Sequence, residues 1–231
     1  KLHLVGTSPR VEVDPAWRDL TPEGRKQLRA ELAKQAVAEK KVPADAWHRV
    51  AKAIEIDKNL RDLEQAGIPT VYHVADVSDR AAMATILDRI RHSDGPIEGI
   101  VHGAGVESSC RFTKKNLDMV SRTVAAKVDG AALLMELTRD DPPRFFLGFG
   151  SIAGRWGSIG QTDYGMASDM LAKLIDWYRH QRPDCHAACF HWQPWAEIGM
   201  AAREETRGTN ALQFLQLLPP AEGVEHFIDE L

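Results

Sequence analysis

Short apolar runs alternate with longer amphipathic stretches along most of the chain. The apolar runs predict strands at 1–6, 70–77, 97–105, 145–151 and 186–192. The apolar spacing between and after these runs predicts helices at 80–92, 113–138, 163–182 and 220–231. Because nearly every strand position is apolar, we expect helices on both faces of the sheet. The pattern predicts an α/β, Rossmann-like fold with a doubly wound parallel sheet.

The stretch between the first two predicted strands differs from the rest. It predicts two helices, 21–40 and 44–65, that carry many charges and few large apolar residues. We interpret 15–67 as a helical insertion within one domain that spans 1–231. A solvated surface elaboration accounts for this composition, and a docking surface for a partner is the alternative.

Composition and charge exclude several classes of function. The 231 residues are 44% hydrophobic and 27% charged, with a formal net charge of −4. This balance argues against a nucleic-acid partner held by phosphate attraction. No apolar run approaches the roughly 20 residues that span a bilayer, so no membrane partner is expected. Since no signal peptide opens the chain, a cytoplasmic location is expected.

The three cysteines are Cys110, Cys185 and Cys189, and their number and spacing fit reduced thiols. Two of them flank His186, with His191 nearby, and all four are residue types that bind zinc. A strand over 186–192 would send alternate side chains to opposite faces. We therefore expect no metal site.

Residues suited to binding or catalysis follow several of the predicted strands. In a parallel sheet, ligands bind at the edge where the carboxyl ends of the strands meet. Asp76 follows one strand, the turn 103–105 follows the next, Ser151 ends a third, and Pro194 and Trp195 follow the last. We expect these residues to converge on one site. In the alternative interpretation, Asp76 caps the next helix and Trp195 only packs in the core.

Ser151 and Tyr164 lie thirteen positions apart, joined by a loop with three glycines. Reducing a ketone requires a hydride on carbon and a proton on oxygen, and a serine hydroxyl can polarise that oxygen. A tyrosine can donate the proton, but its ordinary pKa of about 10 is high, and a nearby ammonium would lower it. Lys127, in a small and apolar helical stretch, is the candidate ammonium because a lysine there needs a partner. Taken singly, each residue also fits a structural role: a turn, a packed aromatic ring or a surface lysine.

Four segments in order carry a resemblance to a known family. They are IVHGAGV (100–106), AAKVDGAALLMELT (125–138), FGSIAGRWGSIGQTDYGMASDMLAKL (149–174) and HWQPWAEIGMA (191–201). They resemble the ketoreductase domains of type I polyketide synthases and polyunsaturated-fatty-acid synthases, which belong to the short-chain dehydrogenase/reductase superfamily. With the opening strand and residues 75–77, the resemblance covers nearly the whole chain. The inserted helices and the closing LPPAEGVEHFIDEL are most similar to iterative enzymes, including the enediyne type.

The resemblance implies a reaction and a role for each matching residue. Tyr164 would donate the proton, Ser151 would orient the carbonyl and Lys127 would assist Tyr164. Ser168 stands where the family usually has asparagine, and a serine there can hold a water in the proton path. The implied reaction is the NADPH-dependent reduction of a β-ketoacyl thioester on an acyl carrier protein to the β-hydroxyacyl thioester.

The resemblance also implies how the cofactor is bound. Asp76 and Val77 would hold the adenine, a turn of small residues would admit the adenosine side, and Pro194 and Trp195 would lie against the nicotinamide. The small residues of that turn are Gly103, Ala104 and Gly105. Many family members have an arginine directly after the opening strand of this chain. Ser8 and Arg10 are the candidates here for contacting the 2′-phosphate of NADPH.

Two further positions are implied to face the substrate, Trp156 and Gln161. Trp156 lies eight residues before Tyr164, where family members that form the L-hydroxyl (A-type) product often have tryptophan. The loop 107–109 reads Glu-Ser-Ser, where the opposite class often has Leu-Asp-Asp. At face value, both features favour the L-hydroxyl product.

The family's first strand and its glycine-rich pyrophosphate turn have no counterpart in the chain. We expect them to precede Lys1 and a last strand to follow Leu231, so that the domain is truncated at both ends. The implied partners are the other synthase domains, with a dimer formed through the parent synthase. Two alternatives stay open. The absent turn and Ser168 favour a structural pseudo-ketoreductase, and the superfamily also contains free-standing dehydrogenases.

Overall fold

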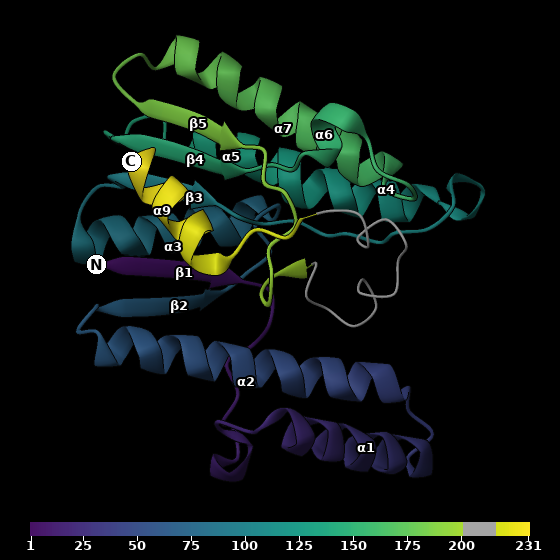
Figure 1. Ribbon diagram of the computed structural model, residues 1–231. Helices are drawn as coiled ribbons and strands as arrows, with labels where there is room; N and C mark the ends of the chain where they lie inside the picture. Colours follow the sequence, from purple (N-terminus) through teal and green to yellow (C-terminus); the bar gives the residue numbers. More distant parts are fainter. Residues whose placement is uncertain (201–215) are drawn as a thin grey trace. The chain divides into compact units, whose positions relative to one another are not determined.

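A computed structural model of the chain describes residues 1–200 and 216–231 (Figure 1). Ala201, the end of one predicted segment, lies outside the described residues. The chain divides into two compact units, Lys1–Asp76 and Val77–Leu231. Strands in both units pair in parallel and alternate with helices, which confirms the predicted α/β class.

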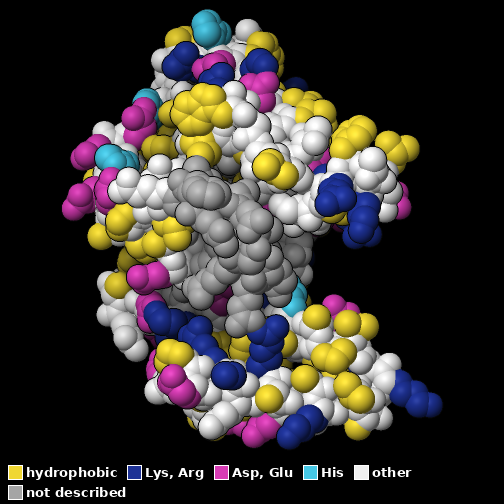
Figure 2. Space-filling view, turned by 45° about the vertical axis from the view of Figure 1, so that its right-hand side comes forward, with side chains coloured by type: hydrophobic (Ala, Val, Ile, Leu, Met, Phe, Trp, Pro, Cys, Tyr) yellow, Lys and Arg dark blue, Asp and Glu magenta, His cyan; other side chains and the backbone are white. Residues whose placement is uncertain are grey.

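The first unit holds two paired strands, β1 (Leu2–Gly6) and β2 (Thr70–Val74), with Leu2 opposite Thr70. Between them the chain forms the 3-10 turn η1 (Pro15–Trp17), α1 (Pro22–Ala38) and α2 (Pro43–Gln65). The two predicted helices are therefore present. Thr21 begins α1, because its Oγ1 accepts the Gly24 N–H at 3.1 Å. In the lower part of Figure 2, this helical region exposes many charged side chains, as the composition predicted.

The second unit holds a three-stranded sheet in the order β3-β4-β5. Its elements are β3 (Gly99–His102), β4 (Phe145–Phe149), β5 (His186–Phe190), α3 (Arg80–Asp94), α7 (Thr162–Gln181) and α9 (Pro220–Asp229). All five predicted strands are present, but hydrogen bonds join them in two groups rather than in one. A short helix that the pattern did not predict, α6 (Ala153–Trp156), follows Ser151.

Alternation along β4 assigns its side chains to the two faces of this sheet. Phe146 packs against Tyr178 of α7, with ring centroids 5.3 Å apart. Phe149, of opposite parity, contacts Phe227 of α9 at 5.9 Å. Helices therefore cover both faces, as the apolar strands predicted.

The helix predicted over 113–138 is interrupted. It consists of η2 (Phe112–Lys114), α4 (Leu117–Val124), the π-helical turn η3 (Ala125–Asp129) and α5 (Gly130–Leu137). Asn116 caps α4 by accepting the Met119 N–H at 2.9 Å. Single π turns within α-helices are frequent at functional sites. Lys127 lies at the centre of this one.

None of the helices within residues 1–200 and 216–231 is long and apolar enough to cross a membrane.

Candidate active site

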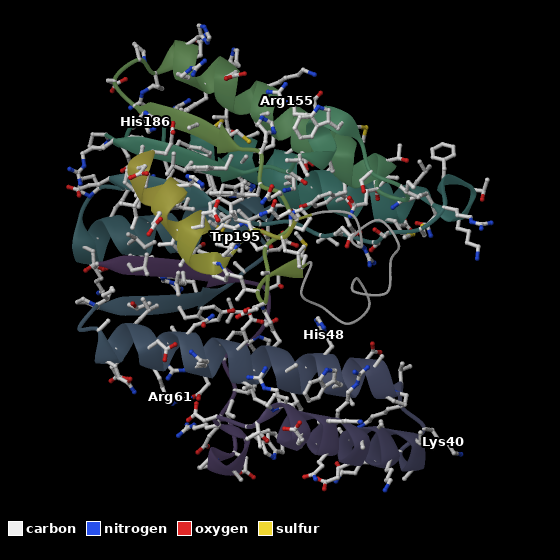
Figure 3. The ribbon with its side chains drawn as sticks, viewed as in Figure 1. Lys40, His48, Arg61, Arg155, His186 and Trp195 are labelled. Atoms are coloured by element: carbon white, nitrogen blue, oxygen red, sulfur yellow. The ribbon has the colours of Figure 1, made fainter. Side chains whose placement is uncertain are left out.

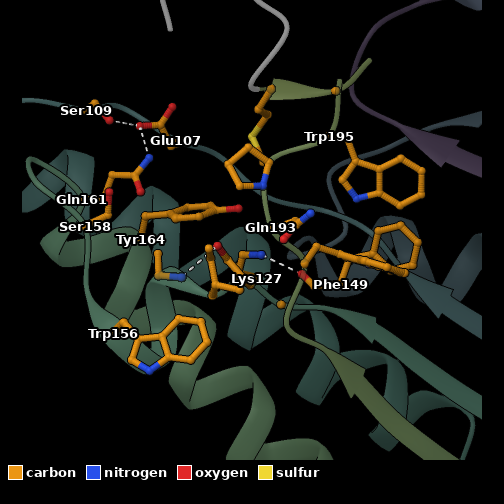
Figure 4. A pocket seen from close by; sticks show the side chains of 18 of the residues that line it. Glu107, Ser109, Lys127, Phe149, Trp156, Ser158, Gln161, Tyr164, Gln193 and Trp195 are labelled. Atoms are coloured by element: carbon orange, nitrogen blue, oxygen red, sulfur yellow. Dashed lines mark hydrogen bonds between the residues drawn. The ribbon is translucent and has the colours of Figure 1, made fainter. Parts of the chain in front are cut away.

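A pocket of about 590 Å³ opens in the second unit, among the residues that follow β3, β4 and β5 (Figure 4). The predicted site residues that line it are Gly103, Lys127, Ser151, Trp156, Gln161, Tyr164, Pro194 and Trp195. Three of the four expected strand ends thus contribute to one pocket. This is the edge of the sheet where ligands of parallel α/β folds bind.

Close packing of α6 against α7 brings Ser151 and Tyr164 to the same wall. A Cβ at Gly154 of α6 would lie 2.8 Å from the Asp169 nitrogen, and one at Gly165 would lie 2.8 Å from the Ala153 oxygen. Only glycine permits this approach of the two backbones. Ser151 also makes a turn contact, since its Oγ accepts the Ala153 N–H at 3.2 Å. The structural alternative for Ser151 and its place in the pocket therefore both hold.

Tyr164 lies in the first turn of α7 and is 9% exposed. Burial raises the pKa of its hydroxyl first, the Glu107 carboxylate raises it further, and a hydrogen bond with Ser151 opposes both. The prediction that the pKa of Tyr164 is lowered is therefore wrong in this structure. Lys127 Nζ lies 5.0 Å from the centroid of the Tyr164 ring, over its face.

Lys127 is only 2% exposed. Its Nζ donates to the Phe149 carbonyl at 2.8 Å. Burial lowers the pKa of this ammonium to about 8, and the nearby Cys189 opposes that change. The lysine is thus a desolvated cation in the wall of the pocket, and the surface-lysine alternative is wrong.

His102, at the end of β3, orients the backbone that carries Lys127. Its Nε2 lies 2.9 Å from the Lys127 carbonyl oxygen, so Nε2 carries the proton and donates it. The imidazole is 2% exposed. Burial lowers the pKa of His102 to about 4, which keeps the ring neutral near pH 7. Sequence reasoning missed this residue, although a histidine that ends an apolar strand was a signal.

Sequence reasoning also missed a polar cluster in the pocket wall. Glu107 Oε1 accepts hydrogen bonds from Gln161 Nε2, at 3.2 Å, and from the Ser109 hydroxyl (Figure 4). The charge of Glu107, two residues after the glycine turn, was the available signal.

Several predicted residues of the second unit lie beside the pocket rather than in its lining. Lys127 packs over Gly105, where a Cβ would lie 3.4 Å from Lys127 Cε, and Val77 packs against Gly130. Ala104 is also outside the lining. Ser168 is fully buried behind α6, and its Oγ has no hydrogen-bond partner among the described residues. A water on Ser168 in the proton path stays a prediction.

Ser8, Arg10 and Asp76 belong to the first unit, so their cofactor contacts stay predictions. One alternative for Asp76 is wrong: Asp79 caps α3 instead, accepting the Ala82 N–H at 3.1 Å.

Trp195 lies after β5 (Figure 3) and combines the two roles that the sequence left open. It lines the pocket, and it also packs edge-on against Trp192, with ring centroids 5.0 Å apart.

The cysteine and histidine side chains near β5 have other neighbours, and His186 Nε2 lies 3.7 Å from Glu230 Oε1. Cys185 is buried, and Cys189 faces Lys127 closely enough for each to shift the pKa of the other. His191 accepts from Arg155 at 3.2 Å. The described part of the chain contains no group of three or more side chains placed to hold a metal ion.

The site thus combines a buried lysine with a tyrosine and a serine at the sheet edge. The family model of the KR domain matches residues 18–197. The chain belongs to the KR domain family. It is therefore an oxidoreductase domain of the short-chain dehydrogenase type, a class that uses a nicotinamide dinucleotide.

Individual relatives agree with this assignment. Polyketide synthase PksL of Bacillus subtilis is 33% identical over 156 residues, which are 64% of this chain and 3% of that protein. Polyketide synthase GfsA of Streptomyces halstedii is 32% identical over 215 residues, 90% of this chain and 3% of that protein. The chain thus spans about 3% of the length of these curated relatives.

Solved structures show the same fold. The first-module ketoreductase of phoslactomycin biosynthesis from Streptomyces sp. HK803 is 30% identical, with a TM-score of 0.66 over 77% of this chain and 39% of that chain. A ketoreductase domain from the bacillaene assembly line is 28% identical, with a TM-score of 0.64 over 75% of this chain and 43% of that one. The predicted membership in the polyketide-synthase ketoreductases is confirmed. The narrower resemblance to iterative, enediyne and polyunsaturated-fatty-acid enzymes stays a prediction.

Proposed function

We propose that this KR domain uses NADPH to reduce a β-ketoacyl thioester, carried by an acyl carrier protein of a synthase, to the β-hydroxyacyl thioester. The observation that supports this most is the desolvated Lys127, placed 5.0 Å from the ring of the pocket tyrosine, Tyr164. Burying a cation beside a phenol costs stability, and groups whose pKa is perturbed by burial cluster at functional sites.

Ser151, Tyr164 and Lys127 have different roles in the reaction of the substrate. The Ser151 hydroxyl donates a hydrogen bond to the ketone oxygen and polarises the carbonyl. Tyr164 transfers its phenolic proton to the same oxygen as negative charge develops there. Lys127 stabilises the resulting phenolate through its charge, and the raised pKa of Tyr164 keeps the donor protonated before reaction.

The residues present fit a nicotinamide cofactor. When bound, this cofactor supplies the hydride for the carbonyl carbon. Pro194 and Trp195 form an apolar wall suited to a flat ring, and Gly103 lines the pocket with bare backbone. The cation of Lys127 lies within the same pocket, where ribose hydroxyls can accept its hydrogen bonds. The choice of NADPH over NADH depends on Ser8 and Arg10.

The roles of Trp156 and Gln161 follow from their place in the lining. Trp156 is 82% exposed at the pocket, where an apolar acyl chain can cover it. Gln161, held by Glu107, presents its amide to the substrate. We propose that Trp156 favours the L-hydroxyl product.

The test is Tyr164→Phe, measured on a model β-ketoacyl thioester with NADPH. Because only the proton donor is removed, kcat should fall by about 10²- to 10⁴-fold. Tyr178→Phe is the matched control, since Tyr178 is a second buried tyrosine of α7 outside the pocket lining. Turnover in the wild type and in Tyr164→Phe at equal rates would refute the assigned donor. A wild type that binds NADPH without reducing any thioester would favour the structural pseudo-ketoreductase.

A further inference from the structure

A buried ion pair connects the loop after β3 with the start of α7. Lys115 Nζ lies 2.6 Å from Asp163 Oδ1, and the two side chains are 5% and 2% exposed. The same ammonium donates to the Ser108 carbonyl at 2.6 Å. Asp163 Oδ1 also accepts the backbone N–H of Tyr164 at 2.9 Å. One lysine therefore contacts both the loop that carries Glu107 and the residue that precedes Tyr164.

The loop 107–110 is attached on its other side to the loop before α7. The Cys110 N–H donates to the Gly160 carbonyl at 3.1 Å, and Gln161 donates to Glu107 at 3.2 Å. Glu107, Gln161 and Tyr164 all line the pocket. Lys115 is outside that lining, so it can act on the pocket only through the groups that it holds.

Stability alone is a poor explanation for this pair. Removing two charges from water is costly, and apolar side chains of similar volume often stabilise a fold as well or better. What a buried pair with defined partners does provide is a fixed geometry. Here it fixes the backbone next to Tyr164 relative to the loop of Glu107.

We propose that Lys115 is a positioning residue of the reductase site. Its ammonium holds the loop 107–110 against Asp163 and so sets the distance between the Tyr164 hydroxyl and the Glu107–Gln161 pair. The proposal rests on the proposed function, because it states how that site is aligned. It predicts that Lys115 affects turnover and product configuration without touching substrate.

The experiment compares Lys115→Met with Lys114→Met in the polypeptide at its natural length. Lys114 is the neighbouring lysine and is exposed, which makes it a matched control. A misplacement of about 1 Å can lower a rate by about 10²-fold, so Lys115→Met should lower kcat by at least about tenfold. The Kd for NADPH should stay within about twofold, and the hydroxyl product should become a mixture of configurations.

Asp163→Asn and the double variant extend this test. Since the two side chains act as a unit, Lys115→Met with Asp163→Asn should lose no more turnover than the worse single variant. Turnover per folded molecule and product configuration in Lys115→Met that equal those of Lys114→Met would overturn the proposal.

Hydrogen exchange separates failure of this proposal from failure of the proposed function. If the wild type reduces no β-ketoacyl thioester, the proposed function fails. The effect of Lys115 on the two loops that it connects can still be measured. Backbone amides of 107–110 and 157–164 should then exchange faster in Lys115→Met than in Lys114→Met. Equal exchange in the two variants would overturn the assignment of Lys115.

Discussion

The two units of the chain are stabilised by different means. In Lys1–Asp76, the carboxylate of Asp57 accepts from Arg18 at 3.1 Å and from Arg61 at 3.0 Å. The buried apolar side chains described in this unit are only Val13, Leu28, Ala36 and Ile56. In Val77–Leu231, apolar side chains from the sheet and its helices form a much larger buried core.

This difference explains why the candidate chemistry lies in the second unit. Burial lowers the pKa of a cationic side chain, and burial needs a dense apolar surrounding. Lys127 meets that condition, with its ammonium between the Phe149 carbonyl and the ring of Tyr164. Arg61 of α2, by contrast, is partly exposed and pairs with Asp57.

Apart from the change at Tyr164 itself, the largest effect is expected from Lys127→Met. Loss of the cation should lower kcat by about 10²-fold. Unfolding free energy should not fall, because a pKa of about 8 instead of 10.5 makes burial of the charged lysine cost on the order of 3 kcal/mol. Lys127→Met removes this cost. The gain offsets the loss of the hydrogen bond to the Phe149 carbonyl, which costs about 1–3 kcal/mol. Chemical denaturation and steady-state kinetics measure the two quantities.

Lys173→Met, on the exposed face of α7, is the control for this variant and should leave kcat unchanged. A Lys127→Met protein that is less stable by more than about 2 kcal/mol, with turnover intact, would show that the lysine serves the fold instead.

His102 offers the next largest effect. His102→Leu leaves the Lys127 carbonyl without its donor, and should cost about 1–3 kcal/mol of stability and about tenfold in kcat. His102→Gln places an amide N–H close to the position of Nε2, so it should recover most of both losses. Thermal unfolding and kinetics of the two variants check this. Equal behaviour of Leu and Gln would mean that the hydrogen bond to η3 has no role.

The pH dependence of the second unit follows from the pKa of Lys127. The ammonium is charged below a pKa of about 8 and neutral above it. If the cation is required, kcat/KM should be constant below that pKa and fall about tenfold per pH unit above it. Tyr164 does not set this limit, since its own pKa is raised. A profile that is flat to about pH 9.5 would contradict the requirement for a charged lysine.

The same titration should affect stability in the opposite direction: kcat/KM falls as Lys127 loses its proton, and the free energy of unfolding rises. Between about pH 8 and pH 10.5, the unfolded chain binds the lysine proton and the folded chain does not, so this group makes stability rise with pH. Its unfavourable contribution is fully present below about pH 8. Denaturation of wild type and Lys127→Met at several pH values isolates the contribution. His102, Cys189 and Tyr164 face Lys127, and Cys189 titrates higher, with a pKa of about 11.

The smallest effect is expected in the first unit. Asp57→Asn removes the charge shared by Arg18 and Arg61 and should cost about 1 kcal/mol, because partly exposed ion pairs contribute little. Thermal unfolding should show a small loss that decreases with added salt, while kcat changes by less than about twofold. A large loss of turnover would show that the charged unit takes part in the chemistry.

The sequence predicted the elements and most of the pocket, for a physical reason. Apolar periodicity reflects burial, and burial defines the strands whose ends carry Gly103, Ser151 and Trp195. The π turn at Lys127 was not predictable, because one extra residue in a helix barely changes the apolar pattern. Neither was α6, which is a single turn within a glycine-rich loop.

Contacts between residues that are far apart in the sequence also could not be predicted. The Lys115–Asp163 pair and the His102 hydrogen bond join positions that no sequence spacing relates. The predicted direction of the pKa shift of Tyr164 was wrong for a similar reason. The neighbouring charge of Lys127 could be inferred from the sequence, but the depth of burial and the approach of Glu107 depend on the folded chain.

Isotope transfer tests the proposed reaction most directly. The natural-length protein is given NADPH that carries deuterium at the transferable C4 position, together with a β-ketoacyl thioester on its carrier. Deuterium should appear on the β-carbon of a β-hydroxyacyl product with a single configuration, and Tyr164→Phe should slow the transfer by about 10²- to 10⁴-fold. Oxidation of NADPH without deuterium on the β-carbon, or equal transfer in Tyr164→Phe, would contradict a reductase site built on Tyr164, Ser151 and Lys127.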